Sequence, residues 1–103
     1  MPLAKHPKTL LTIVTEAVLE RTVVREARER GAQHWLVTEV LSAGSKDGVR
    51  EGGWTAERTV KIQLICEPAV ADAIAEALLA GYSEHYSLAI WFDGVSVLRP
   101  ERY

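Results

Sequence analysis

The order of apolar and polar segments in this sequence predicts an α+β fold, with two helices packed on one face of an antiparallel sheet. Two observations carry the prediction. Short apolar runs typical of strands alternate with two longer stretches in which apolar residues have helical spacing, and the order along the 103 residues is β-α-β-β-α-β. A chain of this length is expected to form one domain, residues 1–103, whose modest core would gain stability from assembly with further copies.

The first strand and helix are expected before residue 31. Residues 10–14, Leu-Leu-Thr-Ile-Val, form a short apolar run with β-branched residues, which predicts a buried strand. Thr15 is a suitable N-cap for a helix over residues 16–30. Gly31 is expected to end that helix. The apolar stripe of the helix consists of Leu19, Val23 and Ala27.

Two further strands and a long loop follow. Residues 35–41 predict the second strand. Residues 44–57 contain four glycines interleaved with charged residues and no apolar period, which predicts a mobile loop. The third strand alternates strictly. One face carries Val60, Ile62, Leu64 and Cys66, and the other carries Lys61, Gln63 and Glu67.

The last third of the chain repeats the pattern. Pro68 suits the first turn of a helix that extends to Gly81, and residues 82–86 form a polar connection. Residues 88–92 predict a strand, Asp93-Gly94 a turn, and residues 95–98 a short extra C-terminal strand. Together the elements predict a ferredoxin-like βαββαβ sandwich, and another subunit is the simplest cover for the open face of its sheet.

Composition narrows the function classes. A formal net charge of −2 argues against a nucleic-acid binder. The lone Cys66 excludes an internal disulfide. The N-terminal segment lacks a signal-peptide pattern, and no apolar run approaches the ~20 residues of a membrane-spanning helix. We therefore expect a cytoplasmic protein without direct membrane insertion.

The Gly-rich loop is the first candidate for ligand chemistry. In Gly44-Ser45-Lys46 the backbone can approach a ligand, a hydroxyl can donate to an anion, and an ammonium adds charge. Arg50 and Arg58 could contribute phosphate-directed hydrogen bonds. A solvated hairpin loop explains the same residues equally well. The segment is not a P-loop, because the required spacing and the following helix are both absent.

Other distinctive residues have plain structural interpretations. Trp54, in the loop, could stack on a ligand, anchor a partner or fold back onto its own domain. Trp35 and Trp91 lie in predicted strands and suit packing or subunit contacts. The helix arginines Arg25, Arg28 and Arg30 are interpreted as a solvated face rather than a binding patch.

Evidence for catalysis is weak. Residues 83–87, Ser-Glu-His-Tyr-Ser, contain acid, base and nucleophile types, but a polar connection between helix and strand explains them better. The histidines and Cys66 lack metal-ligand spacing. After the last strand, Arg99 and Arg102 could hold a phosphate or carboxylate at a subunit boundary, or belong to a frayed terminus.

The chain also resembles PII signalling proteins along nearly its whole length, from about Lys8 to Arg99. Val-Thr-Glu-Val at residues 37–40, followed by Ser-Ala-Gly at 42–44, resembles the strand that leads into their T-loop. Gly-Ser-Lys at 44–46, Val49-Arg50, and the ending Val-Leu-Arg-Pro-Glu at 97–101 resemble PII-like proteins associated with carboxysomes and bicarbonate transporters.

The resemblance implies a non-catalytic sensor, a homotrimer with a nucleotide in each of three clefts between subunits. One cleft wall would contain Ala43, Gly44, Ser45 and Lys46. Gln63 matches a family position near the nucleotide base, and Arg99 matches an arginine that reaches the phosphates. The candidate phosphate or bicarbonate contacts are Arg50, Arg58 and Arg102.

Departures from the sequence pattern of nitrogen-regulatory PII proteins change which ligand is expected. Residues 81–87 lack the Gly- and Lys-rich B-loop, and Lys46 stands where those proteins have a metal-associated glutamine. The resemblance therefore favours ADP or AMP, with ATP and cyclic AMP as alternatives, and adds bicarbonate as a candidate effector but no metal. Ordering of the T-loop at 44–57 would then control a bicarbonate transporter or a carboxysome component.

Two alternatives belong to other classes. A weak nucleotide hydrolase would use Glu84 and His85. A trimeric metal-tolerance protein of the CutA type shares the predicted architecture, although the sequence has no clustered metal site.

Overall fold

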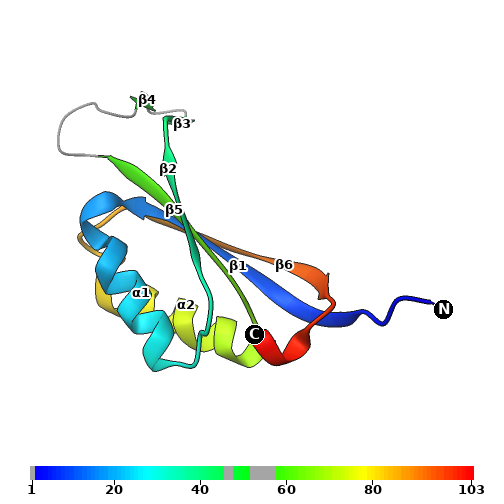
Figure 1. Cartoon of the computed structure of the whole chain (residues 1–103). Helices are drawn as coiled ribbons and strands as arrows, with labels where there is room; N and C mark the ends of the chain where they lie inside the picture. The colour runs from blue at the N-terminus through cyan, green and yellow to red at the C-terminus, as the bar shows by residue number, and fades with distance from the viewer. Residues whose placement is uncertain (1, 46–47, 52–57) are drawn as a thin grey trace.

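The computed structural model describes residues 2–45, 48–51 and 58–103. Its main sheet has four antiparallel strands. Their order across the sheet is β2 (Leu36–Val40), β5 (Thr59–Cys66), β1 (His6–Glu16) and β6 (Leu88–Val97). Two helices, α1 (Glu20–Glu29) and α2 (Pro68–Tyr82), lie together on one face of the sheet (Figure 1). The predicted α+β fold is confirmed.

The core lies between the sheet and the two helices. The predicted alternation of β5 is confirmed, because every second side chain of that strand is buried against the helices. The stripe predicted for the first helix is buried as well. The fully or nearly fully buried apolar residues of this core include Leu11, Ile13, Leu19, Val23, Ala27, Val60, Ile62, Leu64, Cys66, Ala71, Ile74 and Leu78.

The first helix begins later than predicted. Strand β1 continues to Glu16, and a 3-10 turn, η1 (Ala17–Leu19), precedes α1. Thr15 is therefore not an N-cap. Its side chain is 2% exposed, and its hydroxyl donates to the carbonyl oxygen of Ser87 over 2.7 Å. That partner satisfies the hydroxyl, so the β-branched residue remains in the strand.

The end of the first helix matches the prediction. Gly31 has a φ of 109°, a backbone conformation that L side chains rarely adopt, and its N–H donates to the Arg28 carbonyl oxygen over 3.1 Å. No helix in the described ranges is long and apolar enough to cross a membrane.

The Gly-rich segment contains more regular structure than predicted. Strands β3 (Ser42–Ser45) and β4 (Gly48–Glu51) pair antiparallel in a small second sheet. The prediction of a loop without strands over 44–57 is therefore wrong for its first part. A two-stranded ladder rests on backbone hydrogen bonds and needs no apolar period. Residues 46–47 and 52–57, including Lys46 and Trp54, lie outside the described part of the chain.

The predicted turn at Asp93-Gly94 and the short extra C-terminal strand are both wrong. Strand β6 is continuous from Leu88 to Val97. Asp93 pairs with Leu10 and Gly94 with Thr9, because β1 already begins at His6 and offers a partner along the whole of β6. The chain then forms a 3-10 turn, η2 (Pro100–Arg102), at the end of the sheet marked C in Figure 1.

Candidate functional site

The face of the sheet away from the helices presents a row of side chains across all four strands. Leu36 lies opposite Gln63, Gln63 opposite Thr12, and Thr12 opposite Trp91. The Gln63 side-chain amide donates to the Thr12 hydroxyl oxygen over 3.3 Å. Leu36 and Trp91, at the two edges, are 65% and 45% exposed. Large apolar side chains are thus left uncovered in a single copy of the chain.

A pocket of about 270 Å³ opens beside Gln63 at the β5 side of this face. Its lining consists of Leu10, His34, Trp35, Leu36, Gln63, Leu64, Ile65 and Tyr103. The rings of His34 and Tyr103 meet edge to face, with centroids 5.8 Å apart. Aromatic and aliphatic walls with one amide suit a flat heteroaromatic group, because the walls can stack and the amide can both donate and accept.

A buried lysine holds Tyr103 at this pocket. The Lys8 ammonium donates to the Glu67 carboxylate and, over 3.4 Å, to the main-chain oxygen of Tyr103. Lys8 is 8% exposed. This contact connects the first strand, the start of α2 and the final residues, so it positions an aromatic wall that lies far from Gln63 in the sequence.

Cys66 lies next to this lysine in space but is not a reactive group. Burial raises the pKa of the Cys66 thiol, the nearby Glu67 carboxylate raises it further, and the Lys8 ammonium opposes both. The thiol is therefore protonated at neutral pH. It contributes to the apolar core rather than to covalent chemistry.

The two C-terminal arginines lie near the same end of the sheet. Arg99 follows β6, and its guanidinium forms an exposed ion pair with Glu101 over 3.5 Å. Arg102 lies in η2, one residue before Tyr103, and is exposed. Both side chains are therefore at the surface, where an anionic ligand can reach them.

The loop residues occupy the opposite end. Arg58 forms an ion pair with Glu39 over 2.9 Å, and its carbonyl oxygen accepts from the Ala17 N–H over 2.7 Å. In the hairpin, Ala43 pairs with Arg50, and Gly44 pairs with Val49. Ser45 pairs with Gly48, which completes the hairpin. Lys46 lies outside the described residues.

The structure therefore places the predicted site residues that border the loop and the C-terminal arginines at opposite ends of the sheet, with Gln63 between the two ends. The loop is followed by β5, whose first residue, Thr59, pairs with Glu16 at one end of β1. Arg99 follows Val97, which pairs with His6 at the other end. Ten residues of extended strand separate these ends by about 33 Å. In the described part of one chain, the strand ends that border the loop and the C-terminal arginines are therefore far apart.

The connection after α2 is the predicted polar one. Its end is tied to β1, because the Ser87 N–H donates to the Glu16 carboxylate over 2.8 Å. The His85 Nε2 and Glu84 Oε2 atoms are 3.9 Å apart, and both side chains are highly exposed. Within the described ranges, no group of three or more His, Cys, Asp and Glu side chains is arranged to hold a metal ion.

The aromatic pocket walls were not predicted. Trp35 was assigned to a strand but immediately precedes β2, and neither His34 nor Tyr103 was singled out. The pairing of His34 with Tyr103 and the contact of Lys8 with Tyr103 both join residues far apart in the sequence, so no local pattern reveals them. The available signal was the pair His34-Trp35 in the short connection between helix and strand, where large aromatic residues are costly unless they pack.

An antiparallel four-stranded sheet with two helices on one face is the fold of PII-like proteins. The chain belongs to the nitrogen regulatory protein P-II family, whose family model matches residues 8–102. The resemblance to PII-like proteins that the sequence indicated is confirmed.

Solved structures agree with this assignment. A protein from Thermus thermophilus described as PII-like is 31% identical, with a TM-score of 0.82 over 98% of this chain and 99% of that chain. CPII from Thiomonas intermedia, bound to ADP and bicarbonate, is 17% identical, with a TM-score of 0.87 over 98% of each chain. Its complex with ADP, AMP and bicarbonate is 16% identical, with a TM-score of 0.86 over 98% of this chain and 97% of that chain. At these identities CPII supports the fold alone. No curated protein sequence matches the chain.

Proposed function

We propose that this PII-like regulatory protein is a non-catalytic sensor that binds an adenine nucleotide in clefts between the copies of a homotrimer. ADP and AMP are the favoured ligands, ahead of ATP and cyclic AMP. CPII, which shares the fold, binds ADP and AMP, and this supports the choice of ligand class.

The pocket beside Gln63 is the observation that carries the proposal. Its aromatic walls and single amide suit an adenine base, and its position on an uncovered sheet face leaves room for a second copy. The separation of about 33 Å between the strand ends that border the loop and the C-terminal arginines supports a site between copies, where one chain would supply the loop and another the arginines.

The phosphates and a small anion would bind at the charged margins of this cleft. Arg99 and Arg102 would come from one copy. The loop residues Ala43, Gly44, Ser45 and Lys46 would come from the next copy. Bicarbonate is the candidate effector, and its presence in CPII structures supports that choice.

Ligand-dependent ordering of the loop at 44–57 would transmit the signal. The Arg58–Glu39 ion pair lies where this loop meets the sheet. An anion that binds Arg58 would compete with the Glu39 carboxylate and change how the loop is anchored. Arg50, in β4, is a second candidate anion contact. The proposed partner of the loop is a bicarbonate transporter or a carboxysome component.

Calorimetric titration of AMP, ADP, ATP and cyclic AMP, with and without bicarbonate, tests the proposal. We expect ADP and AMP to bind most tightly, with one site per chain. Loss of a charge-assisted phosphate contact in Arg99→Ala should weaken ADP about 10-fold or more and leave adenosine unchanged. Gln63→Ala should weaken adenosine and ADP by the same factor. Failure of all four nucleotides to bind would refute the nucleotide assignment, and an equal loss of adenosine and ADP in Arg99→Ala would refute the role of that arginine.

A further inference from the structure

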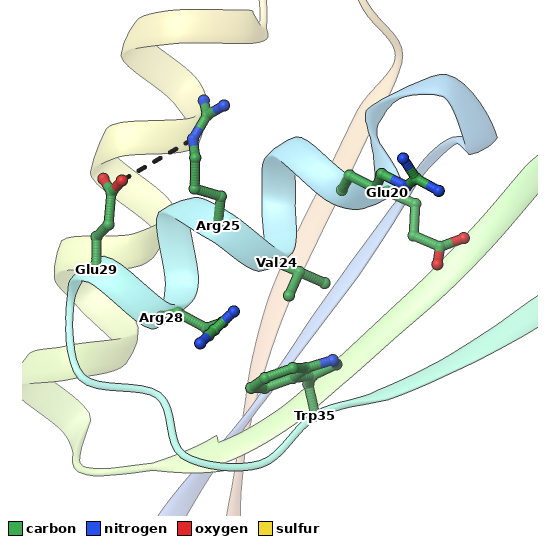
Figure 2. Close-up of a pocket in the computed structure, with 7 residues that line it drawn as sticks. Glu20, Val24, Arg25, Arg28, Glu29 and Trp35 are labelled. Atoms are coloured by element: carbon green, nitrogen blue, oxygen red, sulfur yellow. Dashed lines mark ion pairs between the residues drawn. The ribbon is translucent and has the colours of Figure 1, made fainter.

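A second hollow lies on the other side of Trp35, between that residue and helix α1. It is lined by Glu20, Arg21, Val24, Arg25, Arg28, Glu29 and Trp35. Figure 2 shows Val24 and Arg28 of the helix facing the indole of Trp35, which comes from the connection before β2. We call this hollow the α1 groove. It shares no residue except Trp35 with the pocket beside Gln63.

The arginines of the α1 groove differ in their partners. Arg25 is engaged, because it pairs with Glu29 over 4.0 Å and donates to the Tyr82 hydroxyl over 3.3 Å. Within the described ranges, Arg21 and Arg28 form no ion pair with a carboxylate. They are seven residues apart on one helix, about 10 Å along its axis. The groove therefore offers two cationic groups at a defined spacing.

Trp35 holds the Arg28 guanidinium in place as a preorganised anion-binding group. The Arg28 guanidinium lies over the indole ring, 5.6 Å from its centroid. A stacked guanidinium is held by the ring and keeps its in-plane N–H donors available to a carboxylate. The indole is still 38% exposed, with Val24 beside it. Exposed tryptophan beside arginine is the composition typical of binding hot spots.

We propose that the α1 groove docks an acidic segment of a partner protein. The segment would place two carboxylates about 10 Å apart, one on Arg21 and one on Arg28, with an apolar side chain between them on Val24 and Trp35. In an extended segment successive side chains point to opposite faces, so the two carboxylates lie at positions four residues apart, about 13 Å along the chain, with the apolar side chain midway between them on the same face. The flexible glutamate and arginine side chains accommodate the difference of about 3 Å. Charge complementarity favours such a segment over a membrane or nucleic acid, because Glu20 and Glu29 also line the groove and would repel a continuous anionic surface.

The shared indole couples this docking site to the nucleotide pocket, a step that rests on the proposed function. A ligand against the pocket side of Trp35 restricts the indole and therefore the Arg28 guanidinium stacked on it. Coupling between two sites is reciprocal. Nucleotide should then tighten binding of the acidic segment, and the segment should tighten binding of nucleotide by the same factor.

The probe is a fluorescein-labelled peptide that contains Glu-Ser-Leu-Ser-Glu between glycines, titrated against the protein by fluorescence anisotropy and by ¹H–¹⁵N NMR. We expect shifts at the Trp35 indole N–H and in residues 20–29. Arg21→Ala combined with Arg28→Ala should weaken binding at least 10-fold. Arg30→Ala is the matched control and should leave affinity unchanged, because Arg30 already pairs with Glu26 over 2.9 Å and does not line the groove.

Three outcomes would overturn the proposal. These are no binding at millimolar peptide, equal binding of a Gln-Ser-Leu-Ser-Gln peptide, or tighter binding of phosphatidylserine vesicles or of single-stranded RNA than of the acidic peptide. Circular dichroism of each variant separates loss of binding from loss of fold. A repeat titration with saturating ADP tests the coupling. If ADP itself does not bind, the proposed function fails while the docking result stands. If ADP binds but peptide affinity is unchanged, the coupling fails alone.

Discussion

Truncating either partner of the Lys8–Glu67 ion pair should have unequal effects on stability. The lysine side chain is 7% exposed, whereas the glutamate is 58% exposed. Glu67→Ala leaves a buried ammonium whose remaining contact is the Tyr103 main-chain oxygen at 3.4 Å. Lys8→Met instead removes the buried charge, replaces it with an apolar chain of similar length, and leaves a carboxylate that water can solvate.

The magnitudes follow from this difference in exposure. Breaking a fully buried ion pair by removal of one partner costs about 3–5 kcal/mol. Because Glu67 is half-exposed, the cost of breaking this pair is smaller than for a fully buried one. We therefore expect Glu67→Ala to lower the free energy of unfolding by about 2–3 kcal/mol. Lys8→Met should lower it by less than about 1 kcal/mol, because an apolar replacement avoids the cost of burying a charge.

Urea denaturation at one fixed protein concentration measures both variants. With a slope of about 1.5 kcal/mol/M, Glu67→Ala should lower the midpoint by about 1.7 M and Lys8→Met by less than about 0.7 M. The double variant is the control and should resemble Lys8→Met, since no buried charge then remains. A larger loss for Lys8→Met than for Glu67→Ala, or additive losses in the double variant, would show that this reasoning is wrong.

Three further predictions concern stability. Thr15→Val removes the hydrogen bond to Ser87 from a buried site and should cost about 1–2 kcal/mol, read as a fall of several degrees in Tm, with Thr15→Ser as the milder control; an unchanged Tm would contradict it. Gly31→Ala should lower the free energy of unfolding in urea by about 1–2 kcal/mol, because alanine is strained at a φ of 109°. A clash is not the cause, since the added Cβ would lie 3.9 Å from Val70. An unfolding midpoint equal to that of the wild type would show that the backbone is unstrained. The raised pKa of Cys66 means that the folded state retains the thiol proton more strongly, so its contribution to stability is present below the ordinary value of 9.0 and is lost as pH rises above it. Cys66→Ala should therefore lose less stability than the wild type in urea unfolding as pH rises above 9.0, and an equal fall in the free energy of unfolding for both proteins would exclude this role.

Elements with a strong periodic pattern were predictable from sequence. The alternation of Val60, Ile62 and Leu64 and the helical stripe at Leu19 and Val23 reflect burial on one face, which repeats with the period of the element itself. Such patterns identify the layers of the fold because they depend only on local geometry and on which face is covered.

Features that depend on a distant partner were not predictable. Thr15 could cap a helix equally well until Ser87 supplies its acceptor, and Asp93-Gly94 suits a turn until β1 extends far enough to pair with it. The pocket also depends on distant partners, because Tyr103 meets the ring of His34 and its main-chain oxygen accepts from Lys8 of the first strand. Residue types indicated a ligand, but tertiary contacts decide where its walls meet.

The length of β1 has a genetic consequence. Because Thr59 and Val97, which follow the loop and precede Arg99, pair with opposite ends of this strand, the proposed site would be assembled from two chains. Under the proposed function, a variant altered only at Ser45 and a variant altered only at Arg99 would each bind nucleotide weakly alone. Mixed in one assembly, they would regenerate an intact site wherever an unaltered loop meets an unaltered C-terminal end. Two recessive defects would then complement each other within one oligomer, whereas two defects at the same end would not.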